Sequence, residues 1–450
     1  MKRMLAAVLS LALCAGMLAG CSSQDNGSST ADGGNSSKTS EPAQKVELNV
    51  VTTYGGNDGN VQNWLDASKA WQEKTGNTIK DGSGTANEDF KAQVATDFTT
   101  GAEPDVLFYF NSGDSNAFVK AGKVVDIETI RGEFPDFANN MDDAKLQKCA
   151  SPVDGKVYAV PTYGFWEGMF VNTAVLAEAG VSTPGADYTM EQFIKDCEKI
   201  KAAGKTPIAA SLHEIPHYWF EFMTYNHLSP ATHTVLPKSV DDTQGKAWAD
   251  GINDIKALFE KKFFPSNTLS MSDEEAQDVF YAGEAAFLID GSWRLGTVKE
   301  RMGDKADNVV VTFPPSLNQD RKTTDILAGI SSGYYITQKC WEDPNKRAAA
   351  VDLISYLTSD EQIAEFAKAV PGSTTALKKA PAAPADMDKV TTTVFDMQSK
   401  VTGFTGAVQD LLAENVRSDL FASVKFIVSG EKTPAQAIQA AIDAQAEADQ

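Results

Sequence analysis

Two segments of this 450-residue chain have the spacing of catalytic motifs. Residues 213–217 (His-Glu-Ile-Pro-His) match the HExxH pattern, in which two histidines on one helical face hold zinc. Pro216 would interrupt that helix at a cost of about 3 kcal/mol, which argues against a zinc site. Residues 329–333 (Gly-Ile-Ser-Ser-Gly) match the GxSxG turn of hydrolases, which needs a helix after it, whereas residues 334–337 predict a strand. We therefore expect no catalysis, no metal and no cofactor.

A different chemistry, aromatic stacking combined with hydrogen bonding, is indicated by residues 290–294. They read Asp-Gly-Ser-Trp-Arg and directly follow the apolar residues 285–289, which predict a strand. A sugar presents hydroxyl groups around its rim and C–H groups on each face, so its site needs aromatic rings beside carboxylate, amide or guanidinium groups. Asp290, Trp293 and Arg294 supply these groups. Trp293 could instead fill the core, and Arg294 could instead pair with a local carboxylate.

Residues 161–168 form a second candidate cluster. This segment contains Tyr163, Phe165 and Trp166, followed directly by Glu167. Such a concentration of aromatic residues is unusual for an ordinary surface loop, so we expect these four side chains to contact a ligand. Glu167 could instead be a solvated loop carboxylate.

Polar loops follow two further predicted strands, at residues 46–52 and 105–110. In open α/β sheets, ligands bind at the carboxyl ends of the strands. Asn and Asp side chains in such loops could equally cap the helices that follow. The candidates in these two loops are Tyr54, Asn57, Asp58, Asn111 and Asp114.

Two single residues complete the candidate set. Trp219 lies near the start of a predicted helix and could face a ligand or fill the core. Gly329 begins a loop of small residues whose backbone could contact a ligand, or whose glycines could serve turn geometry alone.

The elements that must position these residues alternate between strand and helix patterns, which predicts an α/β fold. Residues 46–450 are too many for one core, because single cores stop growing near ~250–300 residues. Two domains are therefore expected. The predicted strands are residues 46–52, 105–110, 156–161, 285–289, 309–313 and 333–337.

Charge and cysteine content exclude several kinds of partner. The chain has 61 acidic and 40 basic residues, a net charge of −21, so nucleic acid and anionic lipid are poor partners. Cys149, Cys197 and Cys340 are widely separated without CxxC spacing, so neither a disulfide framework nor a thiolate metal site is expected.

The N-terminus predicts export. Lys2 and Arg3 precede an apolar stretch at residues 4–17, and residues 18–21 (Leu-Ala-Gly-Cys) resemble the lipobox of bacterial lipoproteins. Residues 1–20 would be the signal peptide and Cys21 the lipidated first residue of the mature chain. Residues 21–45 are a polar linker with a root-mean-square span of roughly 25–30 Å, so a lipid anchor is the expected membrane contact. Cleavage as an ordinary secretory signal is the alternative.

Several segments, taken together and in order, resemble the extracellular solute-binding proteins of carbohydrate ABC importers, the group that includes the maltose-binding proteins. The likeness covers nearly all of residues 46–450. The segments that carry it are residues 104–106 with 121–126, 154–161 with 170–172, 280–287 with 291–293, and 353–366 with Pro371.

The resemblance implies a two-lobed α/β fold of the periplasmic-binding-protein kind (type II), with each lobe a sheet flanked by helices and a ligand cleft between the lobes. The first lobe would take residues 46–125 and 315–372, and the second residues 126–314 and 373–450. Residues 124–127 and 309–313 would be the crossings. It also implies that Trp293 stacks on a sugar ring and that residues 161–168 face the cleft.

The function that the resemblance implies is capture of a sugar or oligosaccharide and its delivery to an ABC permease. The protein would be a monomer at the extracellular face of the cell membrane, or in the periplasm if the cell has an outer membrane. A peptide, polyamine or organic anion stays open as the ligand, and a membrane sensor stays open as the partner. An extracellular hydrolase is the alternative from another class.

Overall fold

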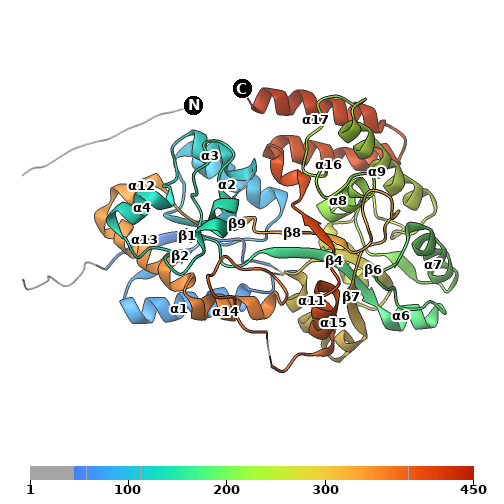
Figure 1. Ribbon diagram of the computed structural model, residues 1–450, viewed down its shortest axis with the longest axis horizontal. Helices are drawn as coiled ribbons and strands as arrows, with labels where there is room; N and C mark the ends of the chain where they lie inside the picture. The colour runs from blue at the N-terminus through green and yellow to red at the C-terminus, as the bar shows by residue number, and fades with distance from the viewer. Residues whose placement is uncertain (1–44, 57, 112, 384, 450) are drawn as a thin grey trace, which may run out of the picture. The chain divides into compact units, whose positions relative to one another are not determined.

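The computed structural model describes residues 45–449 apart from residues 57, 112 and 384 (Figure 1). The predicted signal peptide, the lipidation site Cys21, the linker up to residue 44 and the candidate Asn57 lie outside these described residues. Within the described part, no helix combines the length and apolar character that a membrane crossing requires.

The first sheet has four strands in the order β2 (Thr78–Asp81), β1 (Glu47–Val51), β3 (Val106–Phe110) and β9 (Ser332–Ile336). β1 is parallel to β2 and β3, whereas β9 is antiparallel to β3. Four consecutive residues of β3, from Val106 to Tyr109, are buried. Val106 and Phe108 pack in one apolar cluster, and Leu107 and Tyr109 in another. Both faces of this sheet are therefore covered, as its apolar run predicts.

The second sheet has six strands. Its order is β10 (Gly403–Thr405), β8 (Asp325–Gly329), β4 (Phe165–Asn172), β6 (Ala285–Gly291) and β5 (Thr206–Ile208), and β7 (Val309–Thr312) also pairs with β4. β4 alternates between two cores, with Met169 and Val171 in one and Trp166 and Phe170 in the other. β4 and β6 are antiparallel, so the start of one lies beside the end of the other.

Helices cover both sheets, and α16 and α17 lie side by side in Figure 1. The α-helices are α1 (Val61–Thr75), α2 (Glu88–Thr100), α3 (Asn116–Lys120), α4 (Ile127–Glu133), α5 (Asp143–Leu146), α6 (Thr173–Glu178), α7 (Met190–Ala202), α8 (His217–Tyr225), α9 (Thr243–Glu260), α10 (Asp273–Tyr281), α11 (Arg294–Met302), α12 (Gln338–Glu342), α13 (Pro344–Leu357), α14 (Asp360–Ala369), α15 (Lys389–Gln398), α16 (Glu414–Val428) and α17 (Pro434–Ala448). The 3₁₀ turns are η1 (Gly113–Ser115), η2 (Gln147–Cys149), η3 (Gly303–Asn308) and η4 (Val408–Leu411).

The two motif-like segments do not have catalytic geometry. Pro216 is the N-cap of α8, so His217 is helical while His213 precedes the helix. The two histidines therefore do not share a helical face. Gly329 ends β8 and Ser332 begins β9, so the GxSxG segment joins two strands.

The predicted strand at residues 156–161 is wrong. Within this segment the structure has an isolated bridge between Val160 and Tyr334, because the remaining residues find no continuous ladder of partners. The apolar residues Val157 and Ala159 of this segment pack against the first sheet without forming a strand. Val157 packs against one of its clusters, and Ala159 is buried in the other.

The chain passes between the two sheets at three places. Val160 bridges β9 of the first sheet, whereas Phe165 begins β4 of the second. Gly329 ends β8, and β9 of the first sheet begins at Ser332. Leu377 packs in a core of the first sheet. The next buried apolar residue along the chain, Val390, packs in a core of the second sheet, so the third passage lies between Leu377 and Val390.

The lobe boundaries predicted from the sequence stay a prediction, but the packing favours a different division. Residues 127–146 contribute Ile127, Ile130, Met141 and Leu146 to a core of the first sheet. β8 pairs with β4 and β10 in the second sheet. We therefore propose crossings at residues 161–164, 330–331 and 378–389 in place of 124–127 and 309–313.

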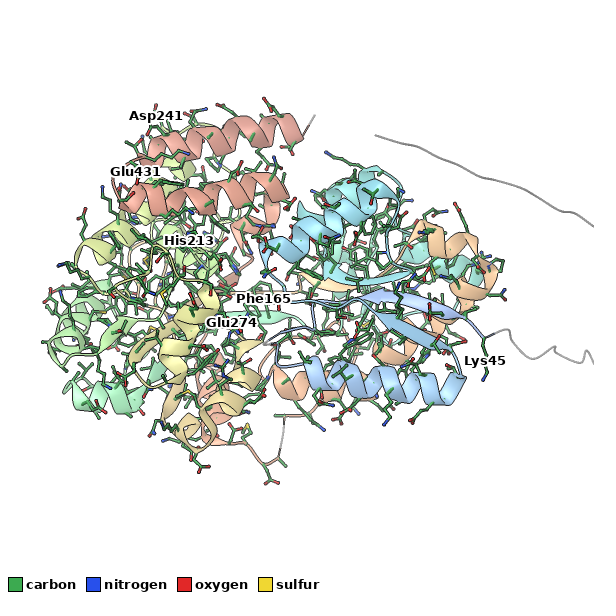
Figure 2. The ribbon with its side chains drawn as sticks, turned by 180° about the vertical axis from the view of Figure 1, so that it is seen from behind. Lys45, Phe165, His213, Asp241, Glu274 and Glu431 are labelled. Atoms are coloured by element: carbon green, nitrogen blue, oxygen red, sulfur yellow. The ribbon has the colours of Figure 1, made fainter. Side chains whose placement is uncertain are left out.

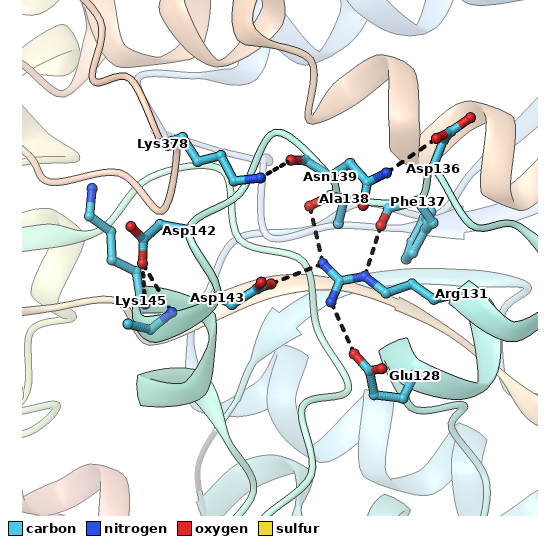
Figure 3. A network of polar contacts seen from close by, with 11 residues as sticks. Glu128, Arg131, Asp136, Phe137, Ala138, Asn139, Asp142, Asp143, Lys145 and Lys378 are labelled. Atoms are coloured by element: carbon cyan, nitrogen blue, oxygen red, sulfur yellow. Dashed lines mark hydrogen bonds and ion pairs between the residues drawn. The ribbon is translucent and has the colours of Figure 1, made fainter.

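A network of polar contacts fixes residues 127–146 to this core (Figure 3). The Arg131 guanidinium donates to the carbonyls of Phe137 and Ala138 and pairs with Glu128 and Asp143. Lys378 donates to the carbonyl of Asn139 over 2.7 Å. A hollow of about 440 Å³ adjoins this network, lined in part by Glu128, Arg131 and Asp143. Because Arg131 is engaged by protein groups, we assign the network a structural role.

The buried Arg321 holds the turn that leads into β8. Its guanidinium donates to the Asn226 side chain and to the carbonyls of Pro314, Pro315 and Asp325. Burial lowers the pKa of Arg321 to about 10. The charge is therefore balanced by carbonyl dipoles and by the rings of Phe222 and Tyr225.

Replacing this guanidinium should destabilise the fold. Arg321→Met leaves several buried acceptors without a donor, and we expect the free energy of unfolding to fall by about 3 kcal/mol. Urea unfolding followed by circular dichroism measures this change. The control is Lys322→Met at the exposed neighbouring position, which should change stability by less than about 0.5 kcal/mol. Equal effects of the two variants would contradict the assignment.

Candidate functional site

The register of β4 and β6 brings the two aromatic clusters of the sequence together. Glu167 pairs with Gly291, and Gly168 pairs with Asp290. Just beyond this pairing, the Ser292 backbone N–H donates to the carbonyl of Trp166 over 2.9 Å. The start of β4 therefore lies beside the residues that follow β6, as the predicted site requires.

Trp293 is the centre of a half-buried aromatic group. Its ring centroid lies 6.2 Å from that of Phe165, which is labelled in Figure 2, and 5.9 Å from that of Tyr218. The His217 ring lies 6.5 Å from it on the same side as Tyr218. Phe165, His217 and Trp293 keep partial solvent exposure, whereas Tyr218 is 7% exposed. These four residues, His217, Tyr218, Phe165 and Trp293, are called the aromatic group below.

Gly291 allows the indole of Trp293 to take this position. A methyl group on Gly291 would lie 2.2 Å from the nearest carbon of the Trp293 ring. The indole therefore lies directly against the backbone at the end of β6, where a side chain would displace it.

His217 and Glu167 form a polar pair at the edge of the aromatic group. Glu167 Oε1 lies 2.9 Å from His217 Nε2, and Glu167 is 1% exposed. Burial raises the pKa of Glu167; burial alone would lower the pKa of His217, but Glu167 raises it. Glu167 Oε2 has no hydrogen-bond partner among the described residues. This oxygen is an acceptor that a hydroxyl donor could satisfy.

Asp290 and Arg294 pair with each other, which is the local alternative foreseen for Arg294. Arg294 Nε donates to Asp290 Oδ2 over 2.7 Å, and the Gly291 backbone N–H donates to Asp290 Oδ1 over the same distance. Asp290 is fully buried, while the Arg294 side chain is 11% exposed. The pair therefore fixes the start of α11, and the Arg294 side chain keeps only slight solvent exposure.

The loop after β1 approaches this region from the first sheet. Burial raises the pKa of Asp58 to about 6, although the Asn60 backbone N–H donates to it and Arg294 lies near enough to lower it. Asn60 also donates to the Tyr163 hydroxyl over 2.9 Å. Asp58 and Tyr163 are half-buried, so both remain candidates for ligand contact.

Three of the predicted aromatic contacts are buried in the cores instead. Tyr54 stacks on Phe108 and is 2% exposed. Trp166 is 1% exposed, and its Nε1 donates to the carbonyl of Pro371 over 2.8 Å. Trp219 is fully buried against Phe264. Contact of these three rings with a ligand stays a prediction, and we leave them out of the site built here.

The loop after β3 is engaged in protein contacts. The Asn111 backbone N–H donates to the carbonyl of Ser331 over 2.8 Å. Asp114 pairs with Arg417 of α16 over 2.7 Å. Gly329 pairs with Phe165 in the ladder of β8 and β4, and is half-buried. Asn111 and Gly329 therefore line the crossing segments beside the aromatic group.

Sequence reasoning missed several residues of this region. His217 and Tyr218 precede Trp219 in the predicted helix, and Trp219 was preferred as the candidate, yet the first turn of α8 directs the two preceding rings toward Trp293. Asp273 and Asp410 also belong here. Burial, with neighbouring carboxylates, raises the pKa of each to about 7, and each is half-buried. No sequence signal marks these two carboxylates.

Segments that belong to the two different sheets are in direct backbone contact at two places. A methyl group on Gly296 of α11 would lie 2.9 Å from the Cα of Gly59, in the loop after β1. A methyl group on Gly113, after β3, would lie 2.2 Å from the carbonyl oxygen of Leu412. Both contacts require glycine.

A family model described as bacterial extracellular solute-binding protein matches residues 59–364. A search among curated proteins gave no match. Solved structures do match, and the three described below each cover 90% of this chain.

Three of these structures illustrate the likeness. A chitin oligosaccharide binding protein is 23% identical with a TM-score of 0.75, and the match covers 90% of this chain and 99% of that one. The GacH receptor of Streptomyces glaucescens, solved with acarbose, is 17% identical (90% and 98% covered, TM-score 0.70). A substrate-binding protein of Listeria monocytogenes, in complex with cycloalternan, is 16% identical (90% and 99% covered, TM-score 0.69). At these identities the likeness establishes the fold, and the predicted fold class is confirmed.

The raised pKa of Asp410 predicts a pH-dependent stability. Between about pH 4 and 7 the native carboxyl holds a proton that the unfolded chain releases, so stability falls as pH rises through this window. We expect Asp410→Asn to raise Tm by about 2 °C at pH 8 and to leave it unchanged near pH 4. Thermal unfolding at the two pH values, with the exposed Asp304→Asn as control, measures the difference. A Tm gain that is equal at both pH values would contradict the burial argument.

Proposed function

Since this chain belongs to the bacterial extracellular solute-binding proteins, which are non-catalytic receptors of ABC transporters, we propose that its ligand is a sugar or oligosaccharide. The observation that carries this proposal is the half-exposed aromatic group around Trp293, beside side chains with free hydrogen-bonding capacity. Aromatic faces stack on the C–H face of a sugar ring, and carboxylates accept hydrogen bonds from its hydroxyls. The ligands named for the similar structures, chitin oligosaccharide, acarbose and cycloalternan, support the same class.

Each polar residue has a role in this proposal. Glu167 Oε2 accepts from a sugar hydroxyl, and His217 holds the carboxylate in place. Asp58 and Tyr163 contribute from the side of the first sheet, and the partly exposed Arg294 donates to a sugar hydroxyl. Trp293, Tyr218 and Phe165 provide the stacking surface.

We further propose that the two sheets belong to lobes that close on the ligand. The crossings at residues 161–164 and 330–331 are short connections that can act as hinges, and residues 378–389, described apart from residue 384, form a longer third connection. The first two lie together, because Gly164 packs against Gly329 and Ile330. Closure would be a population shift toward the conformer in which Gly59 meets Gly296, and the permease would recognise that conformer.

The location proposed for the receptor is the outer face of the cell membrane, held through lipid on Cys21. The lipobox-like residues 18–21 and the polar residues 22–45 support this proposal. We propose a monomer that delivers its ligand to the permease of an importer.

A cationic solute is the second candidate ligand. Asp58, Asp273 and Asp410 have no ion-pair partner within 4 Å among the described residues, and burial raises the pKa of each. A bound cation would offset the free-energy cost of burying these carboxylates in their charged form. Polyamines therefore belong in the same screen.

A thermal-shift screen of residues 45–450 against mono- and oligosaccharides, polyamines and dipeptides tests the ligand class. A compound that binds the native state raises Tm by mass action. At a concentration of 100 times its Kd, it adds about 2.7 kcal/mol to the free energy of unfolding. We expect sugars to raise Tm and Trp293→Ala to weaken binding of the best sugar about tenfold or more. The control is Trp341→Ala, because Trp341 is a half-buried ring that packs on Phe134 away from the site. A Tm response to no sugar, or unchanged affinity in Trp293→Ala, would refute the sugar proposal.

The glycine contact offers a test of closure. Gly296→Ala improves the helix propensity of α11 by about 1 kcal/mol, yet its methyl group would collide with the Cα of Gly59. We expect about tenfold weaker affinity for the best sugar of the screen, without loss of Tm. The control is Gly132→Ala in α4, where the methyl group has open space. Unchanged affinity in Gly296→Ala would rule out the closed conformer as the binding form.

A further inference from the structure

Arg417 of α16 is a fully buried cation that contacts elements of the first sheet. Its helix packs in a core of the second sheet through Val416, Leu420 and Val424. The guanidinium reaches away from this core: Nη1 lies 2.7 Å from Asp114 Oδ1, and Nη2 lies 3.0 Å from Glu88 Oε2.

The partners of Arg417 come from two segments beside the first sheet. Glu88 is the first residue of α2, and Asp114 lies in η1 after β3. Lys91 completes the cluster at 3.1 Å from Glu88 and 3.7 Å from Asp114, with its ammonium 4.6 Å from the centroid of the Phe110 ring. From the side of the second sheet, the Ser418 hydroxyl also donates to Glu88 Oε2 over 2.7 Å. Two cations thus pair with two anions, and the carboxylates of Glu414 and Asp410 lie near enough to interact with the same groups.

The charges in this cluster depend on one another. Burial alone would raise the pKa of Glu88, but Lys91, Arg417 and Ser418 lower it to about 2. Burial alone would lower the pKa of Arg417, but Asp114 and Glu88 raise it above its ordinary range. Separation of α16 from α2 and η1 would expose both sides of the cluster to water. The cluster therefore belongs to the conformer in which the two sides meet.

The same two sides also meet through the backbone. Gly113 of η1 touches the carbonyl of Leu412, which precedes α16. A methyl group on Gly113 would also lie 2.9 Å from the carbonyl oxygen of Asp410. These contacts join protein atoms alone and include no ring of the aromatic group around Trp293, so they can form without a ligand.

We propose that Arg417 is a positioning residue for closure: its ion pairs with Glu88 and Asp114 hold the two lobes together independently of the ligand and set the fraction of closed receptor. This inference rests on the proposed closure. It predicts that the free protein is partly closed and that loss of Arg417 shifts it toward the open conformer.

Distance measurements on the ligand-free protein test this role without any knowledge of the ligand. Spin labels at Thr96→Cys in α2 and Gln439→Cys in α17 lie at exposed positions on the two sides. In residues 45–450, which lack Cys14 and Cys21, the remaining cysteines Cys149, Cys197 and Cys340 are buried, so the labelling reagent should select the two introduced thiols. Pulsed electron paramagnetic resonance then gives the fractions of short and long distances.

We expect Arg417→Met to raise the ratio of open to closed receptor about tenfold. Glu88→Gln should raise this ratio less. In the double variant the change in free energy should be smaller than the sum of the two single changes, because both substitutions remove the same ion pair. The control is Arg347→Met, which removes an ion pair with Glu133 inside the first-sheet side. It should leave the distances unchanged.

The outcomes separate the two proposals. Distances in Arg417→Met and Glu88→Gln that equal those of the parent would overturn the role of Arg417, even if sugars bind. Should Arg417→Met fail to fold, Glu88→Gln decides the question alone, because Glu88 is partly exposed and its loss is tolerable. Failure of every sugar in the thermal-shift screen would refute the ligand class and leave the distance result standing.

Discussion

The antiparallel pairing of β4 with β6 is the constraint on which the site depends. Glu167 opposite Gly291 places the carboxylate at the start of one strand beside the indole that follows the other. A shift of this register by one residue would turn Glu167 to the opposite face and separate Phe165 from Trp293. The register is secured because β4 is buried on both faces and packs in two different cores. Core packing therefore determines which polar groups can meet a ligand.

The crossings between the sheets impose a second constraint. Residues 161–164 carry Tyr163 and lead directly into Phe165, and residues 330–331 follow Gly329. The segments that connect the two sheets are thus also the segments that adjoin the aromatic group. Any rotation of one sheet relative to the other must act on these residues, which couples the proposed closure to the geometry of the site.

The fold class and the two residue clusters of the candidate site could be predicted from the sequence. Apolar runs at residues 105–110 and 285–289 predicted β3 and β6. The clusters at residues 161–168 and 290–294 singled out Phe165 and Trp293, which the structure brings together, while their contact with a ligand stays a prediction. Helical phase and strand face could not be predicted. Trp166 and Glu167 are adjacent on β4, and Tyr218 and Trp219 are adjacent on α8. Because both faces of β4 and most of α8 are buried, composition alone does not tell which neighbour faces the site. Tertiary packing brings Asp410 to the site and Arg417 to Glu88 and Asp114, and neither residue carries a local signal in the sequence.

The contact between Gly59 and Gly296 has a consequence for ligand size. Side chains at an interface can change rotamer and tolerate an incomplete fit, whereas two backbones in contact have no such freedom. If closure ends at this contact, the enclosed space has a fixed final height. A ligand that is thicker by the width of a methyl group would hold the two glycines apart. The backbone contact would then limit the thickness of the ligands that permit full closure.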